Sequence, residues 1–191
     1  MLSENLQSEK KESILVNNKP ILFFFLKLLA LVIIWECSYH FILKPIRIPD
    51  KLLTDFVTAG TVKVLNLFPI EQGVYHWVSP PGLTGAYIML NNKTVFLIAD
   101  ICNALDLIII YLGFIILLPY KISRKVVFGI GGVIVLALAN IVRCVLLYRI
   151  YKTHPDMFEL HHHYTFTVLM YLLISLGWIL FTNKSKKHEV G

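Results

Sequence analysis

The chain has 191 residues, of which 57% are hydrophobic and 16% are charged, and its mean hydropathy is +0.68. This length accommodates one domain, and so apolar a composition excludes an ordinary soluble fold. The formal net charge of +6 comes largely from basic residues just outside long apolar runs, where membrane topology explains them and no nucleic-acid partner is needed.

The chain begins with a polar segment, residues 1–20, which we predict to be a cytoplasmic tail. It is mixed in charge, and no small-residue cleavage site closes the apolar run that follows, so it does not resemble a signal peptide. That run, residues 21–43, is the first predicted span, because it is long enough to cross about 30 Å of hydrocarbon at about 1.5 Å per residue.

The section between residues 44 and 93 contains five prolines and no clear span. Residues 52–68 have apolar side chains at helical spacing, which predicts an extracytoplasmic amphipathic helix. Two β-prone runs flank Asn91 and Asn92 and predict a short β-hairpin that leads directly into the next helix.

Three further apolar runs predict spans over residues 95–119, 126–150 and 164–181. Because the loop at 120–125 and the tail at 182–191 are basic, the positive-inside rule places that loop and both termini in the cytoplasm. We therefore expect an all-α protein of the cytoplasmic membrane, with one domain over residues 21–181 and a bundle of about four transmembrane helices.

This topology places several reactive residue types near the extracytoplasmic side. Cys102 and Arg143 lie about 10 Å inside their predicted spans by helical rise, and His161–His163 open the last one. An arginine within a span costs about 2.5–3.5 kcal/mol on insertion scales, so Arg143 should face a cavity or a partner, with Asn140 on the same helical face. A thiolate needs a nearby cation or base, and these residues therefore predict a thiol active site.

Each of these residues also has a structural explanation. Arg143 could point into lipid or pair with Asp100 or Asp106, and an isolated Cys102 is more often an inert buried thiol. Neighbouring histidines on a helix are about 100° apart, so at most two of the three share a centre, and we predict no metal site. The alternative functions are a membrane adaptor or assembly factor, and a small proton-relay or transport subunit.

The order of cysteine, arginine and histidine resembles the exosortase/archaeosortase family of membrane transpeptidases, most closely its short Bacteroidota forms. The resemblance lies in the run TVFLIADICNALDL around Cys102, the run NIVR ending in Arg143, and a histidine opening the last span. It covers about residues 85–181. The family usually has a small residue and then glycine after the cysteine, whereas Asn103 and Ala104 stand here.

The resemblance implies that Cys102 is a nucleophile forming a thioester, that Arg143 stabilises the transition state, and that a histidine completes the triad. In many members this histidine precedes a glycine by four positions; Thr165 is the nearest equivalent, which indicates His161, with His162 as second candidate and Asn140 in support. The implied substrates are secreted proteins with a C-terminal motif, a hydrophobic span and a basic end. The acceptor would be a lipid, a sugar or water, and no metal or organic cofactor is needed.

Overall fold

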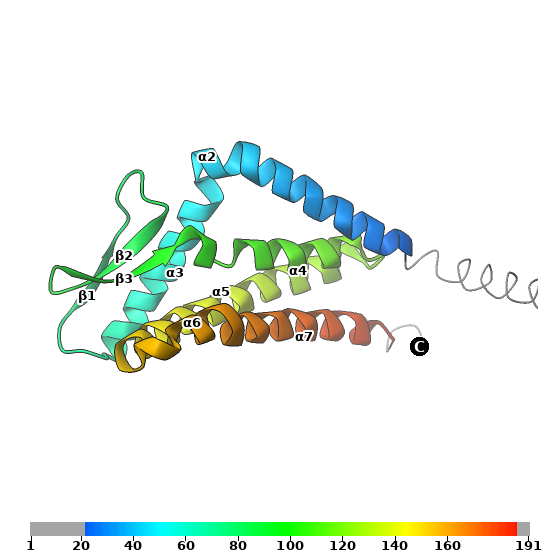
Figure 1. Ribbon diagram of the computed structural model, residues 1–191. Coiled ribbons are helices and arrows are strands. Elements are labelled where there is room, and N and C mark those ends of the chain that lie inside the picture. Colours follow the sequence, from blue (N-terminus) through cyan, green and yellow to red (C-terminus); the bar gives the residue numbers. More distant parts are fainter. Residues whose placement is uncertain (1–21, 187–191) are drawn as a thin grey trace, which may run out of the picture.

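The computed structural model describes residues 22–186, with side chains as far as residue 183 (Figure 1). The predicted tail at residues 1–20 and most of the basic tail at 182–191 lie outside the described side chains. Within the described part, three helices have the length and apolar composition to cross a membrane: Leu22–Ile46, Ile122–Thr153 and Pro155–Asn183. The chain is therefore a multi-pass membrane protein of the all-α class.

The second predicted span, residues 95–119, has a different structure. Its first part is strand β3 (Lys93–Ala99), followed by the short 3₁₀ helix η2 (Asp100–Cys102), and only α4 (Leu105–Leu117) is helical. Thirteen residues rise about 20 Å, less than the hydrocarbon thickness. Within an apolar run, periodicity does not distinguish a buried strand from a helix. The predicted span therefore included both the end of β3 and helix α4.

Helix α4 nevertheless packs within the bundle, against α5 (Ile122–Thr153) and α7 (Phe166–Lys186). Figure 1 shows the start of the first helix, the α4–α5 connection and the end of α7 together at one end of the molecule, with the sheet at the other. Tyr111 of α4 fills the centre, donates a hydrogen bond to the carbonyl of Phe128, and lies where a Cβ on Gly132 would overlap its ring. Glycine on α5 thus permits the close approach of the helices.

The predicted amphipathic helix is α3 (Ile48–Leu67), and the hairpin is part of a three-stranded antiparallel sheet in the order β1-β2-β3. Strand β2 (Gly85–Leu90) pairs with β3 across Asn91 and Asn92, whose positive φ angles of 49° and 64° suit a tight hairpin turn. The hairpin is therefore confirmed, whereas β1 (Tyr75–Val78) was not predicted.

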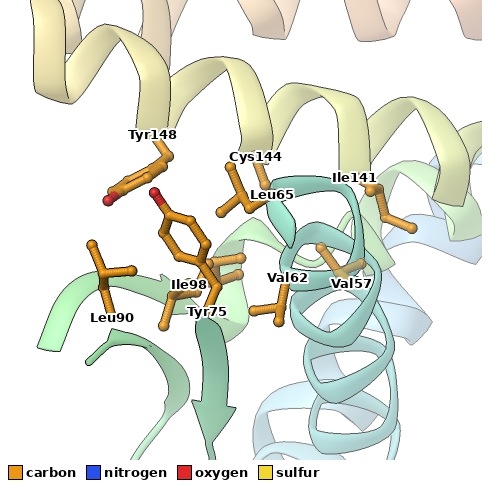
Figure 2. Close-up of a cluster of buried hydrophobic side chains, with 10 residues drawn as sticks. Val57, Val62, Leu65, Tyr75, Leu90, Ile98, Ile141, Cys144 and Tyr148 are labelled. Carbon is orange, nitrogen blue, oxygen red and sulfur yellow. The ribbon is translucent and has the colours of Figure 1, made fainter. Parts of the chain in front are cut away.

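The sheet, α3 and the adjacent end of α5 share a second core (Figure 2). Leu65 of α3, Tyr75 of β1 and Tyr148 of α5 are almost completely buried there, with the two tyrosine rings packed edge to face. Cys144 also lies in this core, as an inert buried thiol would, and all three cysteines of the chain are free. Cys102 packs against the edge of this cluster, where the sheet meets the membrane bundle.

Candidate active site

Cys102 lies on the turn between β3 and α4, so it precedes the helix on which the sequence had placed it. The turn is held by backbone hydrogen bonds from Asp100 N to Thr84 O (3.1 Å) and from Asn103 N to Asp100 O (3.1 Å). Ala104 follows with a φ of 66°, in the left-handed region. Glycine adopts this conformation without strain. The family that the sequence resembles usually has glycine at the position of Ala104.

A buried ion pair anchors the start of this turn. Asp100 accepts hydrogen bonds from Arg47 Nε (2.6 Å) and Arg47 Nη2 (2.9 Å), in the two-pronged geometry that suits a guanidinium and a carboxylate. The hydroxyl of Thr54 on α3 donates a third hydrogen bond to Asp100 (2.8 Å). Asp100 is thus neutralised by a residue 53 positions away and is not a free partner for Arg143.

A second polar contact fixes the other side of the cysteine. Asn103 is buried, and its amide donates to Asp50 Oδ1 (2.9 Å) while its carbonyl oxygen accepts from Leu105 N (2.8 Å), at the first residue of α4. Asp50 is buried as well and accepts from the hydroxyl of Tyr39 on the first helix (2.9 Å). The residue after the cysteine therefore links the turn to two other helices.

Two residues of α5 face the same turn. Asn140 is completely buried and donates from Nδ2 to the backbone carbonyl of Cys102 (2.8 Å). Arg143, one turn further along, donates from Nη1 to Asn140 Oδ1 (3.3 Å). The structure thus brings Asn140 and Arg143, which share the predicted helical face, to the turn that carries Cys102.

The guanidinium of Arg143 keeps free donor capacity. Among residues 22–183 it forms no ion pair, and its buried Nε has no hydrogen-bond partner. It lines a pocket of about 260 Å³. Cys102, Asp106, His162 and His163 line the same pocket. An unpaired guanidinium beside a thiol is an arrangement that binds an anionic or developing negative oxygen.

Of the three consecutive histidines, His162 is the one beside the thiol. Its Nε2 lies 3.5 Å from Cys102 Sγ, and its ring stacks on Phe158 at a centroid distance of 5.4 Å. His161 instead packs against Phe166, and His163 pairs with Glu159. The stretch His161–Thr165 is π-helical, which changes the direction of each histidine from that expected on an α-helix. The structure therefore brings His162 to the thiol, and not the predicted His161.

Two features of the pocket shift the pKa of the Cys102 thiol in opposite directions. Partial burial raises the pKa of Cys102 above its ordinary value, because the thiolate is less well solvated there, while the charge of Arg143 lowers it. Burial is the larger effect, so the resting form is the protonated thiol. Such a cysteine needs a base to become a nucleophile, and His162 is within reach of its proton.

The sequence did not predict the polar residues that hold the turn, Arg47, Asp50 and Thr54. Arg47 and Asp50 lie in the proline-containing section after the first span, where a charged residue near a membrane surface is unremarkable. One available signal was their combination with Asp100 and Asn103, since polar residues next to apolar runs require buried partners. Their pairing over about fifty positions depends on the tertiary fold.

One comparison with known proteins finds a family match. The model of the transmembrane exosortase family matches residues 16–180, most of the chain. No curated protein and no solved structure matches the chain. The match includes the turn that carries Cys102, the α5 residues Asn140 and Arg143, and the π-helical histidines.

Proposed function

The chain belongs to the transmembrane exosortase family, and on that premise we propose that it is a membrane-embedded cysteine peptidase and transpeptidase that sorts secreted proteins. The observation that carries the proposal is the 3.5 Å separation of Cys102 Sγ and His162 Nε2 in a pocket that also holds the unpaired guanidinium of Arg143. Nucleophile, base and cation come from three different elements of the fold. A purely structural role does not require them to meet in a pocket.

The proposed reaction begins with proton transfer from Cys102 to His162. The sulfur attacks the carbonyl carbon of the scissile peptide bond, which forms a C–S bond and moves the carbonyl electron pair to oxygen. When the C–N bond breaks, the imidazolium returns the proton to the leaving amine, and an acyl thioester remains on Cys102. An acceptor hydroxyl, amine or water then attacks the thioester and releases the thiol.

Arg143 is proposed to stabilise the oxygen that becomes negative in this reaction. Among residues 22–183 its Nε has no partner and only Nη1 is engaged, by Asn140, so donors are available in a partly buried site. Hydrogen bonds in such surroundings are stronger than in water, and they form without reorganisation when they are already positioned. Asn140 holds both the guanidinium and the carbonyl of Cys102, and supports the relative position of the two catalytic groups.

We assign the base role to His162 in place of His161, on the basis of their contacts. His162 is half-buried against Phe158 and reaches the sulfur, while the contact of His161 is with Phe166. His162, the second candidate in the sequence analysis, becomes the catalytic histidine in this proposal. The two neighbouring histidines form a matched pair for mutagenesis.

The proposed substrates are secreted proteins whose C-terminal tail has a short motif, a hydrophobic span and a basic end. The basic loop and tails favour cytoplasmic termini, which supports the proposal that the sheet and the cysteine pocket lie on the extracytoplasmic side of the cytoplasmic membrane. A tail anchored in lipid then presents its motif at the level of Cys102. The acceptor is proposed to be a lipid, a glycan or water, and the reaction as written uses no cofactor.

The alternative of a proton-relay subunit gains no support from Asp50 and Asp100, two of the three acidic residues near the turn. Asp100 is held by Arg47 and Thr54, and Asp50 by Tyr39 and Asn103, so neither is a free relay carboxylate. The adaptor alternative predicts that the thiol chemistry is dispensable. Detection of a covalent intermediate on Cys102 would therefore distinguish the enzyme from an adaptor.

The experiment is co-expression with a secreted reporter that carries a sorting tail encoded in the same genome, in protein with Cys37 and Cys144 replaced by alanine. Mass spectrometry should find a reporter-derived acyl group on Cys102 that hydroxylamine removes, because hydroxylamine cleaves thioesters. His162→Ala should abolish the adduct, whereas His161→Ala should leave at least half of it. Absence of the adduct in the parent protein while the reporter is still cleaved would exclude the thioester mechanism.

A further inference from the structure

A cluster of potential metal ligands lies at the mouth of the cysteine pocket. Glu159, His162 and His163 each offer one ligand atom, and these three atoms lie within 4.8 Å of one another. Glu159 and His163 are exposed, while His162 and His163 also line the pocket that holds Cys102. An ion from solution therefore has access to the cluster, and a bound ion would lie beside the thiol.

The π-helical turn explains why two consecutive histidines converge. On an α-helix their side chains would be about 100° apart, but here the two rings are 4.7 Å apart between centroids. Glu159, one turn earlier, brings an oxygen to 3.0 Å from His163 Nε2. Two ligands of a tetrahedral zinc are separated by about 3.4 Å, given metal–ligand distances of about 2.0–2.2 Å, so an ion fits with small adjustments.

We propose that Glu159, His162 and His163 form a binding site for a divalent transition metal ion such as Zn²⁺, and that the bound ion holds the enzyme inactive. Two imidazoles and a carboxylate are a ligand set typical of zinc, with a fourth position left open. An exposed carboxylate–imidazole pair contributes little to the stability of a fold. Stability therefore does not explain why these three side chains lie together, whereas metal binding does. The inhibitory part of the inference rests on the proposed function of His162.

The inhibition follows from the valence of imidazole. A neutral imidazole has one nitrogen with a free electron pair, and the other nitrogen carries hydrogen. Whichever nitrogen of His162 binds the metal, no nitrogen remains to accept the proton of Cys102. The sulfur also lies 3.5 Å from His162 Nε2, so an ion bound to this histidine lies near the thiol.

The metal site is tested without any substrate, by titrating Zn²⁺ into the purified full-length protein in detergent, free of a histidine tag, and measuring heat of binding. We expect one ion per chain. Glu159→Gln should weaken binding at least tenfold, since it removes the anionic ligand, whereas His161→Gln, the matched neighbour outside the cluster, should bind as the parent does. Equal affinity in the parent protein and Glu159→Gln would overturn the site.

The inhibitory role is tested by alkylation of Cys102 with iodoacetamide, in protein with Cys37 and Cys144 replaced by alanine. Saturating Zn²⁺ should slow alkylation at least tenfold, and a chelator should restore the rate. In Glu159→Gln, Zn²⁺ at the same concentration should change the alkylation rate little from the rate of the same variant without metal. Equal rates with and without Zn²⁺ in the parent protein would overturn the inhibition. Loss of the proposed transpeptidase function would instead appear in the reporter assay and leave the calorimetric result intact.

Discussion

The side-chain amide of Asn140 donates a hydrogen bond of 2.8 Å to the backbone carbonyl of Cys102, and the same side chain accepts one from Arg143. One completely buried residue of α5 thus connects the nucleophile turn to the cation. The turn is fixed on its other sides by Asp100 and Asn103, which are held by residues of the first helix and α3. The position of the sulfur therefore depends on polar contacts from several helices.

Replacement of Asn140 by alanine should lower both stability and activity. It leaves the Cys102 carbonyl and one Arg143 donor without their partner in a buried setting, at a cost of about 1–3 kcal/mol. Thermal unfolding in detergent and processing of the tailed reporter are the measurements. Asn140→Ala with an unchanged unfolding temperature and unchanged processing would show that this contact does not position the site.

Arg143→Lys should reduce processing severely although the charge is kept. Lysine loses the planar fork of donors, and loss of one oxyanion donor costs about 2.7–4 kcal/mol, or about 10²–10³ in rate. Arg149 is exposed on the same helix, so Arg149→Lys is the matched control and should process normally. Protein levels are compared in parallel, and near-parent rates in a normally expressed Arg143→Lys protein would remove Arg143 from the mechanism.

The reactivity of Cys102 should increase with pH through the neutral range and beyond. Burial raises its pKa, so the thiol is mostly protonated at neutral pH and the reactive thiolate gains about tenfold per pH unit until the pKa is reached. Arg143→Gln removes the influence that lowers the pKa and should shift the alkylation profile to higher pH. A profile that reaches its plateau below pH 7, or one that moves to lower pH in Arg143→Gln, would contradict this description.

Ala104→Gly should be tolerated and should raise the unfolding temperature slightly. A left-handed alanine costs about 1–2 kcal/mol, of which the greater chain entropy of glycine offsets about 0.5–1 kcal/mol. Ala104→Val should have the opposite effect, because a β-branched residue is strained at this φ and the site is buried. Thermal unfolding of the two variants checks the sign, and a lower unfolding temperature for the glycine variant would show that the methyl packing is worth more than the strain.

The sequence predicts the class of the fold, and its failures have identifiable causes. Cys102 and Arg143 line one pocket because topology places both near the same side of the membrane. The run from Val95 to Pro119 is apolar apart from Asp100, Asn103 and Asp106, and its periodicity alone does not show where the strand ends and the helix begins. The choice of His161 rested on the position of a glycine in the resembling family, at which Thr165 stands here. The sequence did not reveal the π-helical turn, in which His162 is the histidine beside the thiol.

The central claim is that Cys102 is the nucleophile of a sorting reaction, and one assay of precursor against product tests it most directly. Cells co-express a tailed reporter with Cys102→Ala, Cys37→Ala or Cys144→Ala, each checked for a normal protein level. We expect that Cys102→Ala abolishes conversion to product, while the other two variants retain most of it. Normal processing by stably expressed Cys102→Ala would contradict the claim and favour an adaptor role.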